Sequence, residues 1–179
     1  MSGQRSEEQP AAFTASLNIY LLGPPSVECQ GRALPIARRQ TRALLYRLAA
    51  HLELLSREQL CFLLWPDTPD ATARTNLSRL LNLLRRALPD PGLLLRQGDR
   101  VGLDPGRVWS DTKSWADAST ALPSHPTAAN WQRLIALYRG PFLSGFSLPD
   151  RPEFEIWATR ERERWERSYL EALAALARQ

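Results

Sequence analysis

Between Thr68 and Leu88, leucines recur at the three- and four-residue spacing of an amphipathic helix. At about 100° per residue, one side of this helix collects Ala73, Leu77, Leu80, Leu81, Leu84 and Leu88. The opposite side collects Thr72, Thr75, Arg79, Asn82 and Arg86. We expect Thr68 to be the N-cap and Pro69 the first helical residue, because both residue types favour those positions. The pattern predicts a helix over residues 69–88.

The polar side of this helix is unusual in its charges. No acidic residue occurs between Asp70 and Asp90, whereas four arginines do, namely Arg74, Arg79, Arg85 and Arg86. An ordinary surface helix mixes acidic with basic residues. A face of Arg, Asn, Thr and Ser suits a partner made of phosphates and base edges, so the pattern favours a DNA-recognition helix.

The segments before this helix predict a small sheet and two helices. Residues 1–15 are small and polar without periodicity and are expected to be disordered. Alternating strand formers with a turn at Gln30-Gly31 predict three short antiparallel strands between residues 17 and 36. A helix is expected over residues 37–53, with these residues facing inward: Ala43, Leu44, Leu48 and Leu52.

Ser56 and Gln59 form a capping-box pattern, so the next helix should begin at Arg57. It should end at Trp65, because Pro66 cannot continue it. A helix, a short loop and a longer helix make the helix-turn-helix plan, in which the second helix enters the major groove. Residues 93–103 then predict a β-hairpin with its turn at residues 97–99, which is the position of a wing.

The second half of the chain predicts helices only. The sequence favours helices over residues 110–122, 127–140 and 152–179. Along the last of these, one face carries Phe154, Trp157, Trp165, Tyr169, Leu173 and Leu176. Its charges over residues 160–167 alternate in sign and are interpreted as a solvated surface of paired side chains.

Charge concentrates around the predicted recognition helix. Of the net charge of +4, residues 31–100 hold twelve arginines against six acidic residues, while residues 101–179 are balanced. A basic block of this kind is the footprint expected of a nucleic-acid contact. Arg38, Arg39 and Arg42 lie in the first turn of the helix over 37–53, where cations oppose the helix dipole. A phosphate backbone nearby would explain them; solvated surface charge is the alternative.

Other classes of function find little support. No apolar run approaches the roughly 20 residues that span a bilayer, and no secretory leader is visible, so a cytoplasmic location is expected. Lys113 is the only lysine, an arginine bias typical of a GC-rich bacterial genome. Cys29 and Cys61 are expected to be reduced thiols. With two histidines, no Cys/His cluster, no phosphate loop and no nucleophile elbow, we expect no enzyme, metal or cofactor.

Several local strings, in this order along the chain, resemble one family: LNIYLLGPPSVECQGRAL, SREQLCFLLWPD, ARTNLSRLLNLLRRAL, YRGPFLSGF and FEIWATRERERW. They are similar to the Streptomyces antibiotic regulatory protein (SARP) family of transcriptional activators. The resemblance implies an α+β OmpR/PhoB-type winged helix over residues 16–105, with an N-terminal antiparallel sheet, three helices and a C-terminal hairpin wing. It also implies an all-α, tetratricopeptide-like bacterial transcriptional activator domain over residues 108–179, expected to be incomplete. That domain is longer in the family, so we expect a fragment of a larger regulator; an unusually short member of the family is the alternative.

The residues and the resemblance together predict a sequence-specific regulator that binds double-stranded promoter DNA. We expect base contacts from Thr75, Arg79 and Asn82. We expect phosphate contacts from Arg38, Arg39, Arg42, Arg74, Arg85 and Arg86, and wing contacts from Arg96 and Arg100. The resemblance further implies activation through RNA polymerase, touched by Asp67, Thr68 and Asp70, and head-to-tail pairing of two copies on direct repeats.

Two departures from the family pattern and three alternatives accompany this interpretation. Thr75-Asn76-Leu77 stands where the family commonly has Asn-Asn-Leu, so a different base is expected there. Val101-Gly102-Leu103 replaces the family's Tyr-Arg-Leu type string in the wing, which leaves Arg100 to compensate. A repressor could use the same winged helix, and Asp67 and Asp70 could simply begin a helix. Alternatively, the helical half is a protein-interaction module of a larger signalling protein.

Overall fold

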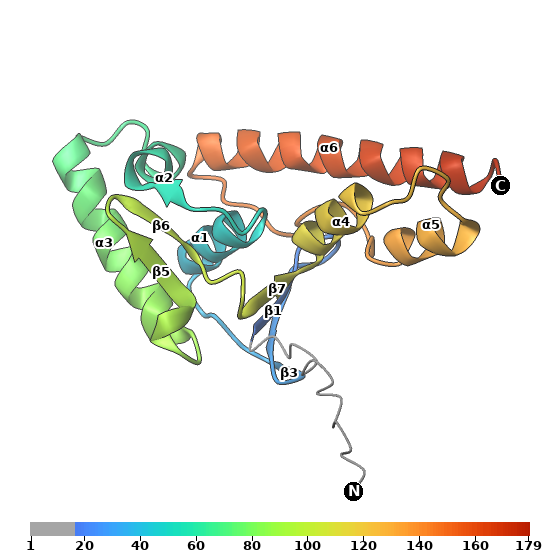
Figure 1. The fold of residues 1–179 in the computed structure, drawn as a ribbon. Coiled ribbons are helices and arrows are strands. Elements are labelled where there is room, and N and C mark those ends of the chain that lie inside the picture. Colours follow the sequence, from blue (N-terminus) through green and yellow to red (C-terminus); the bar gives the residue numbers. More distant parts are fainter. Residues whose placement is uncertain (1–16) are drawn as a thin grey trace, which may run out of the picture.

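The structure, a computed structural model, describes residues 17–179; the tail predicted to be disordered lies outside this range. In chain order the elements are β1 (Leu17–Tyr20), β2 (Ser26–Cys29), β3 (Arg32–Ala33), α1 (Arg39–Ala49), β4 (Leu55–Ser56), α2 (Arg57–Leu64), α3 (Asp70–Ala87), the 3₁₀ turn η1 (Pro91–Leu93), β5 (Leu94–Gln97), β6 (Arg100–Leu103), β7 (Val108–Ser110), α4 (Asp111–Thr120), α5 (Ala128–Ile135) and α6 (Pro152–Leu176). The predicted fold class, a winged helix followed by a helical segment, is confirmed (Figure 1).

The N-terminal sheet has the order β3-β2-β1-β7. Its first three strands are antiparallel, as the alternation predicts, and a turn with positive φ at Gln30 and Gly31 connects β2 to β3. A fourth strand, β7, pairs parallel to β1, with Leu17 opposite Val108. The sequence does not predict β7, because three residues carry no periodicity and their partner strand lies at the other end of the winged helix in sequence.

The helix α1 is shorter than the sequence predicts. It ends at Ala49, so Leu52 is not part of its inward face but lies in the following loop with a φ of 50°. The other three residues predicted to face inward, Ala43, Leu44 and Leu48, are completely buried.

The helix α2 begins with the predicted capping box. The Gln59 backbone N–H donates to Ser56 Oγ at 3.1 Å, and the Ser56 N–H donates to Gln59 Oε1 at 2.9 Å. The helix ends at Leu64, and Trp65 follows it as a buried C-cap before Pro66. The predicted start of this helix is confirmed, and its end lies one residue earlier than predicted.

The N-terminus of α3 differs from the prediction. Pro69 is the N-cap, Asp70 is the first helical residue, and no side chain caps the helix. Thr68 belongs to the preceding turn, where its N–H donates to the Trp65 carbonyl at 3.2 Å, so the prediction of Thr68 as N-cap was wrong. The leucine side of α3 is buried as predicted, and the helix packs against α1 and α2.

The predicted hairpin is present as β5 and β6, joined by a two-residue turn at Gly98-Asp99, with Gly98 at a φ of 58°. A short strand that the sequence does not predict, β4, pairs with β6 on its other edge and completes a three-stranded sheet. Gly102 permits this pairing: a Cβ there would lie 2.9 Å from Leu54 Cδ2 and 3.0 Å from the Glu53 carbonyl oxygen. Position 102 of the wing therefore requires glycine, because the segment that leads into β4 approaches it closely.

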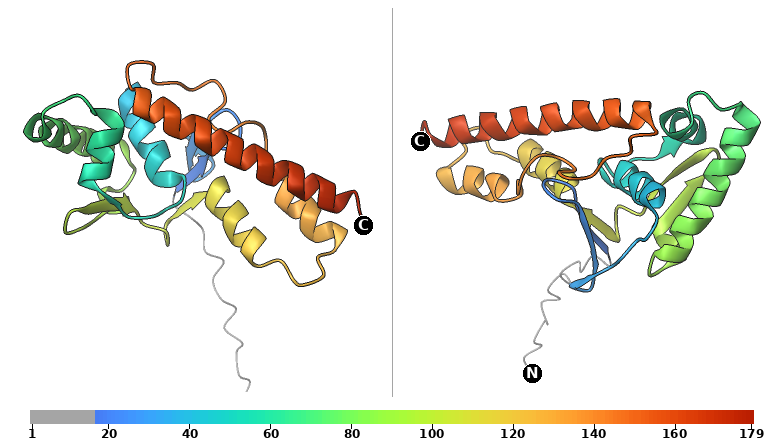
Figure 2. Two further views of the ribbon diagram at one scale, coloured as in Figure 1. Left: turned by 90° about the horizontal axis from the view of Figure 1, so that it is seen from above. Right: turned by 180° about the vertical axis from the view of Figure 1, so that it is seen from behind.

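The helical half consists of α4, α5 and α6. Ser110 caps α4 by accepting a hydrogen bond from the Lys113 N–H at 3.2 Å. The helix α5 ends at Ile135, five residues before the predicted end, and α6 begins at Pro152 as predicted. Figures 1 and 2 show α6 running along the molecule, from α2 at one end to α5 at the other, and it contacts both.

A buried carboxylate joins the two halves. Asp111, 1% exposed, accepts hydrogen bonds from the N–H groups of Leu21 at 2.8 Å and Leu22 at 2.9 Å, beyond the end of β1, and from Thr112 at 2.9 Å. Burial raises the pKa of this carboxyl, while the backbone donors and the nearby Arg139 favour its ionised form. The domain boundary predicted between residues 105 and 108 lies inside one connected sheet, because β7, which follows it, pairs with β1, which precedes it.

A second set of polar contacts connects the loop after α1 to α6. Glu161 is 12% exposed and accepts hydrogen bonds from His51 Nε2 at 2.9 Å and from Trp165 Nε1 at 3.0 Å. Burial works against its ionised form, but the hydrogen bond and charge of His51 hold the pKa of Glu161 below its usual value. The interpretation of residues 160–167 as a solvated, paired surface was thus wrong at Glu161, because this carboxylate turns inward toward His51, in the loop after α1.

Two further predictions can be compared with the described residues. Cys61 is buried and Cys29 half-buried, and both are free thiols, as predicted. Within residues 17–179, no helix combines the length and the apolar character needed to cross a membrane.

Candidate nucleic-acid interface

The outward face of α3 forms a ridge of four exposed polar residues: Thr75, Arg79, Asn82 and Arg86. They lie opposite the buried leucines, as the helical spacing predicts. Asp70 is the only acidic residue of the helix, and its carboxylate pairs with Arg74 Nε at 2.8 Å. The ridge therefore presents donors and acceptors without a neighbouring carboxylate, which suits base edges and phosphates.

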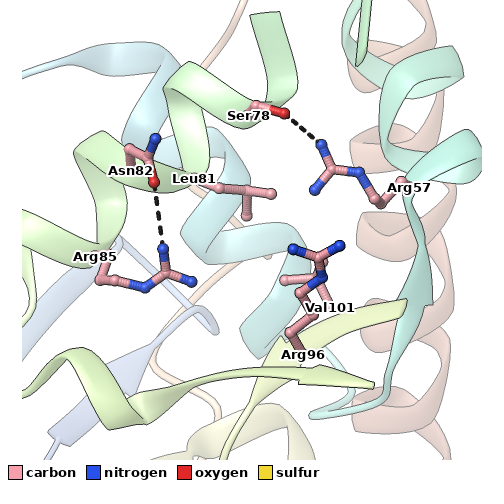
Figure 3. A pocket seen from close by; sticks show the side chains of 7 residues that line it. All are labelled: Arg57, Ser78, Leu81, Asn82, Arg85, Arg96 and Val101. Carbon is pink, nitrogen blue, oxygen red and sulfur yellow. Dashed lines mark hydrogen bonds between the residues drawn. The ribbon is translucent and has the colours of Figure 1, made fainter. Parts of the chain in front are cut away.

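One flank of the ridge opens into a hollow between α3 and the wing, called here the α3–wing hollow. It has a volume of about 210 Å³ and is lined by Arg57, Ser78, Leu81, Asn82, Arg85, Arg96 and Val101. Figure 3 shows three guanidinium groups converging on it, from α2, α3 and β5. Three of the lining residues are arginines and none is acidic.

The other flank opens into a second hollow, between α3 and the N-terminus of α1. This α1–α3 hollow of about 270 Å³ is lined by Arg38, Gln40, Trp65, Asn76, Arg79, Leu80 and Leu83. Arginines thus lie on both flanks of the ridge. A helix in a major groove about 12 Å wide has a sugar–phosphate strand on each side, and the two hollows match that arrangement.

Local hydrogen bonds orient two of the residues predicted to contact bases. Thr75 Oγ1 donates to the Ala71 carbonyl of its own helix at 2.9 Å, which leaves its oxygen free to accept. Asn82 Oδ1 accepts from Arg85 Nη1 at 3.2 Å. Arg79 is exposed and lines the α1–α3 hollow.

The arginines predicted to contact phosphates do not all lie on this surface. Arg38 and Arg39 are exposed at the start of α1, where Arg38 lines the α1–α3 hollow, and Arg86 is exposed on the ridge. Arg42 lies elsewhere: its guanidinium carbon is 5.7 Å from the centre of the Phe146 ring, in the segment between α5 and α6. This cation–π contact, together with partial burial, directs Arg42 toward the helical half.

The two wing arginines point to opposite faces of the hairpin. Arg96 pairs with Val101 across β5 and β6, and both line the α3–wing hollow. Arg100 pairs with Gln97 and, by the alternation of side chains along a strand, points to the other face. The sequence grouped them as neighbours of one turn, whereas the structure brings only Arg96 to α3.

The loop between α2 and α3 carries the predicted polymerase contacts. Asp67 and Asp70 are exposed, and Thr68 is half-buried. Trp65 is buried in the core, and Asp70 begins α3 and pairs with Arg74. Asp67 is therefore the exposed acidic side chain of this loop that lies outside both helices.

Sequence reasoning missed Arg57. This residue lies directly after the N-cap of α2, where it reads as an ordinary first-turn cation, yet its side chain reaches α3 and donates to Ser78 Oγ at 2.6 Å. Only the crossing of α2 and α3 brings it there. Among residues 17–179, no three His, Cys, Asp or Glu side chains gather closely enough to hold a metal ion.

Comparison with known proteins finds a likeness among solved structures. No protein-family model matches the chain, and no curated protein matches it. Among solved structures, it is similar to Mycobacterium tuberculosis EmbR in complex with a low affinity phosphopeptide, with a TM-score of 0.67 and 23% sequence identity. The similarity covers 92% of this chain and 45% of the EmbR chain. The chain therefore has an EmbR-like fold, a winged helix followed by a helical segment, and spans less than half of EmbR's length.

Proposed function

We propose that this protein is a transcription regulator that binds specific DNA sequences by placing α3 in the major groove. The observation that carries the proposal is the exposed ridge on α3, free of carboxylates and flanked by two arginine-lined hollows. The basic block of residues 31–100, in which these arginines lie, supports it. The EmbR-like fold agrees with the resemblance to SARP activators.

The ridge residues take different roles in this proposal. Arg79 reads guanine and Asn82 reads adenine, since these are the bases that their side chains can bind bidentately. Thr75 accepts from an amino group of adenine or cytosine, because its own proton already bonds the Ala71 carbonyl. Arg38, Arg39 and Arg86 bind phosphates and set the register of the helix.

Binding is tested by fluorescence anisotropy with a duplex selected from random DNA and a scrambled duplex of the same length. Arg79→Ala should weaken binding to the selected duplex by roughly 1–3 kcal/mol and relax the preference at one base pair. Arg39→Ala should weaken both duplexes alike and lower the salt dependence by about one unit of the log–log slope. Arg167→Ala, on the exposed face of α6, is the control for a lost charge.

Two outcomes would contradict the proposal. If Arg79→Ala leaves the preference for the selected duplex unchanged, the assigned facing of α3 is wrong. If the wild-type protein binds neither duplex at low salt, the DNA-binding proposal fails, and the result favours the alternative, in which the helical half is a protein-interaction module.

The resemblance supports a finer proposal, in which the protein is a cytoplasmic activator that binds direct repeats as head-to-tail pairs and touches RNA polymerase with the α2–α3 loop. Asp67 is the residue to change, since it is exposed and lies outside α3. In transcription assays with purified polymerase, Asp67→Ala should keep DNA binding and lose activation. Unchanged activation would exclude this contact, and transcription that falls on adding the wild-type protein would indicate a repressor.

A further inference from the structure

The helical half reaches the surface around α3 through one side chain of α1. Gln40 lies in the first turn of α1 and lines the α1–α3 hollow together with Arg38 and Arg79. Its amide oxygen accepts two hydrogen bonds from Arg151, one from Nε and one from Nη2, both at 3.2 Å. Arg151 is the N-cap residue of α6 and belongs to the helical half. We propose that Arg151 is a positioning residue for DNA binding, which acts by orienting Gln40 and does not itself touch the DNA.

Arg151 is itself held in place by the turn that leads into α6. Its Nη1 donates to the Asp150 carbonyl at 2.7 Å, and its backbone N–H donates to the Leu148 carbonyl at 2.9 Å. The Leu148 N–H donates to the Glu155 carboxylate, and the Glu155 N–H donates to the Arg151 carbonyl at 3.2 Å. The turn is thus closed against the first turn of α6, and the guanidinium meets Gln40 from a fixed backbone.

The same segment is attached to α1 at a second place, further along the helix. The Phe146 ring packs edge-on against Tyr46 of α1, with 5.1 Å between the ring centres, and against Phe154 of α6 at 6.1 Å. The guanidinium carbon of Arg42 lies 5.7 Å from the centre of the same ring. Residues 146–151 therefore follow α1 between two points of contact, which relates the position of Gln40 to that of α6.

Local electrostatics does not favour an arginine at this place. Among the described residues, no side chain caps α1, and its first turn holds no acidic residue. The positive end of the helix dipole lies here, beside Arg38 and Arg39, so the charge of Arg151 is opposed. What the contact does achieve is orientation: with its oxygen bonded to Arg151, the Gln40 amide keeps its NH₂ group as the end that donates. A side chain that is already oriented loses less conformational entropy when it binds.

The proposal rests on the proposed function and is tested by a double-mutant cycle on DNA affinity, with fluorescence anisotropy and a duplex selected from random DNA. Arg151→Ala should weaken binding roughly fivefold. The log–log salt slope and the base preference should not change, because no phosphate or base contact is lost. Gln40→Ala should also weaken binding, and the double variant should bind no more weakly than Gln40→Ala alone, because Arg151 then has nothing to orient.

Two further variants separate positioning from other effects. Phe146→Leu loosens the same segment from α1, so it should cause a smaller loss of affinity that also disappears in the Gln40→Ala background. Arg167→Ala removes an equal charge from the exposed face of α6 and should not change the affinity. Thermal melting checks that each variant is folded, and the cycle with Phe146→Leu replaces the first one if Arg151→Ala does not fold.

The outcomes against the proposal are distinct. If Arg151→Ala weakens binding by the same factor in both backgrounds and lowers the salt slope by about 0.9, Arg151 contacts a phosphate directly and the positioning role is wrong. If the affinity of the folded variant is unchanged, the contact with Gln40 has no role in binding. In both cases the role of α3 stands. If the wild-type protein binds no DNA, the proposed function itself fails.

Discussion

Replacing Asp111 with alanine should destabilise the whole chain. The Asp111 carboxylate accepts backbone N–H groups from Leu21 and Leu22, which are fully buried, and from Thr112 at the start of its own helix. It thereby connects the end of β1 in the winged helix to α4 in the helical half. In Asp111→Ala, the N–H groups of Leu21 and Leu22 lose their acceptor and remain buried away from water.

The size of the effect follows from these contacts. A buried donor left without a partner costs about 1–3 kcal/mol, so the N–H groups of Leu21 and Leu22 together cost about 2–6 kcal/mol. Part of this is offset, because burial raises the pKa of Asp111 and its carboxylate was itself costly to bury. A net loss of about 3 kcal/mol is a large share of the roughly 5–15 kcal/mol that stabilises a domain.

Urea unfolding followed by tryptophan fluorescence and far-UV circular dichroism measures this loss. Asp117→Ala on the exposed side of α4 is the matched control, and it should cost less than about 1 kcal/mol. Both signals should change in one transition for the wild-type protein, since the halves share a sheet and a core. A loss below about 1 kcal/mol for Asp111→Ala would contradict its role as a buried acceptor. Two separate wild-type transitions would contradict a shared sheet and core.

Two further changes test other contacts. Glu161→Gln should cost about 1 kcal/mol at pH 7, because His51 lowers the pKa of Glu161 in the folded protein and so stabilises its ionised form. The difference in free energy of unfolding between this variant and the wild type should shrink as the pH falls through that lowered pKa. Urea unfolding at pH 7 and pH 3.5 measures this difference, and an equal value at both would contradict the pairing of Glu161 with His51. Gly102→Ala should cost about 1–3 kcal/mol, because its Cβ would press on Leu54 and on the backbone of Glu53. Gly92→Ala, whose Cβ would meet only the ends of the Asp90 and Arg107 side chains, should cost less. Thermal melting of both variants measures this, and the reverse order would exclude the steric explanation.

The parts of the fold that the sequence predicts are those fixed by local signals. The leucine spacing of α3, the Ser56–Gln59 capping box and the glycine turn of the wing each act within a few residues, and each is found where predicted to within one or two residues. The ridge on α3 follows from the same spacing. Element ends were less predictable: Thr68 lost its capping role because it takes part in the turn after Trp65.

The parts that escaped prediction depend on contacts between distant segments. The strand β7 exists because β1 offers it an edge, and β4 exists because Gly102 lets it approach β6. Arg57 and Arg42 are both first-turn cations of helices, yet one reaches α3 and the other packs on Phe146. No local pattern separates these two outcomes, because the crossing of the helices decides them.

The claim that α3 reads DNA sequence is tested most directly by selecting bound duplexes from a random pool with the wild-type protein and with Arg79→Ala in parallel. The wild type should enrich a defined motif. The variant should enrich the same motif with the preference lost at one base pair, where guanine stood. A pool with no enriched motif, or an identical motif from both proteins, would contradict it.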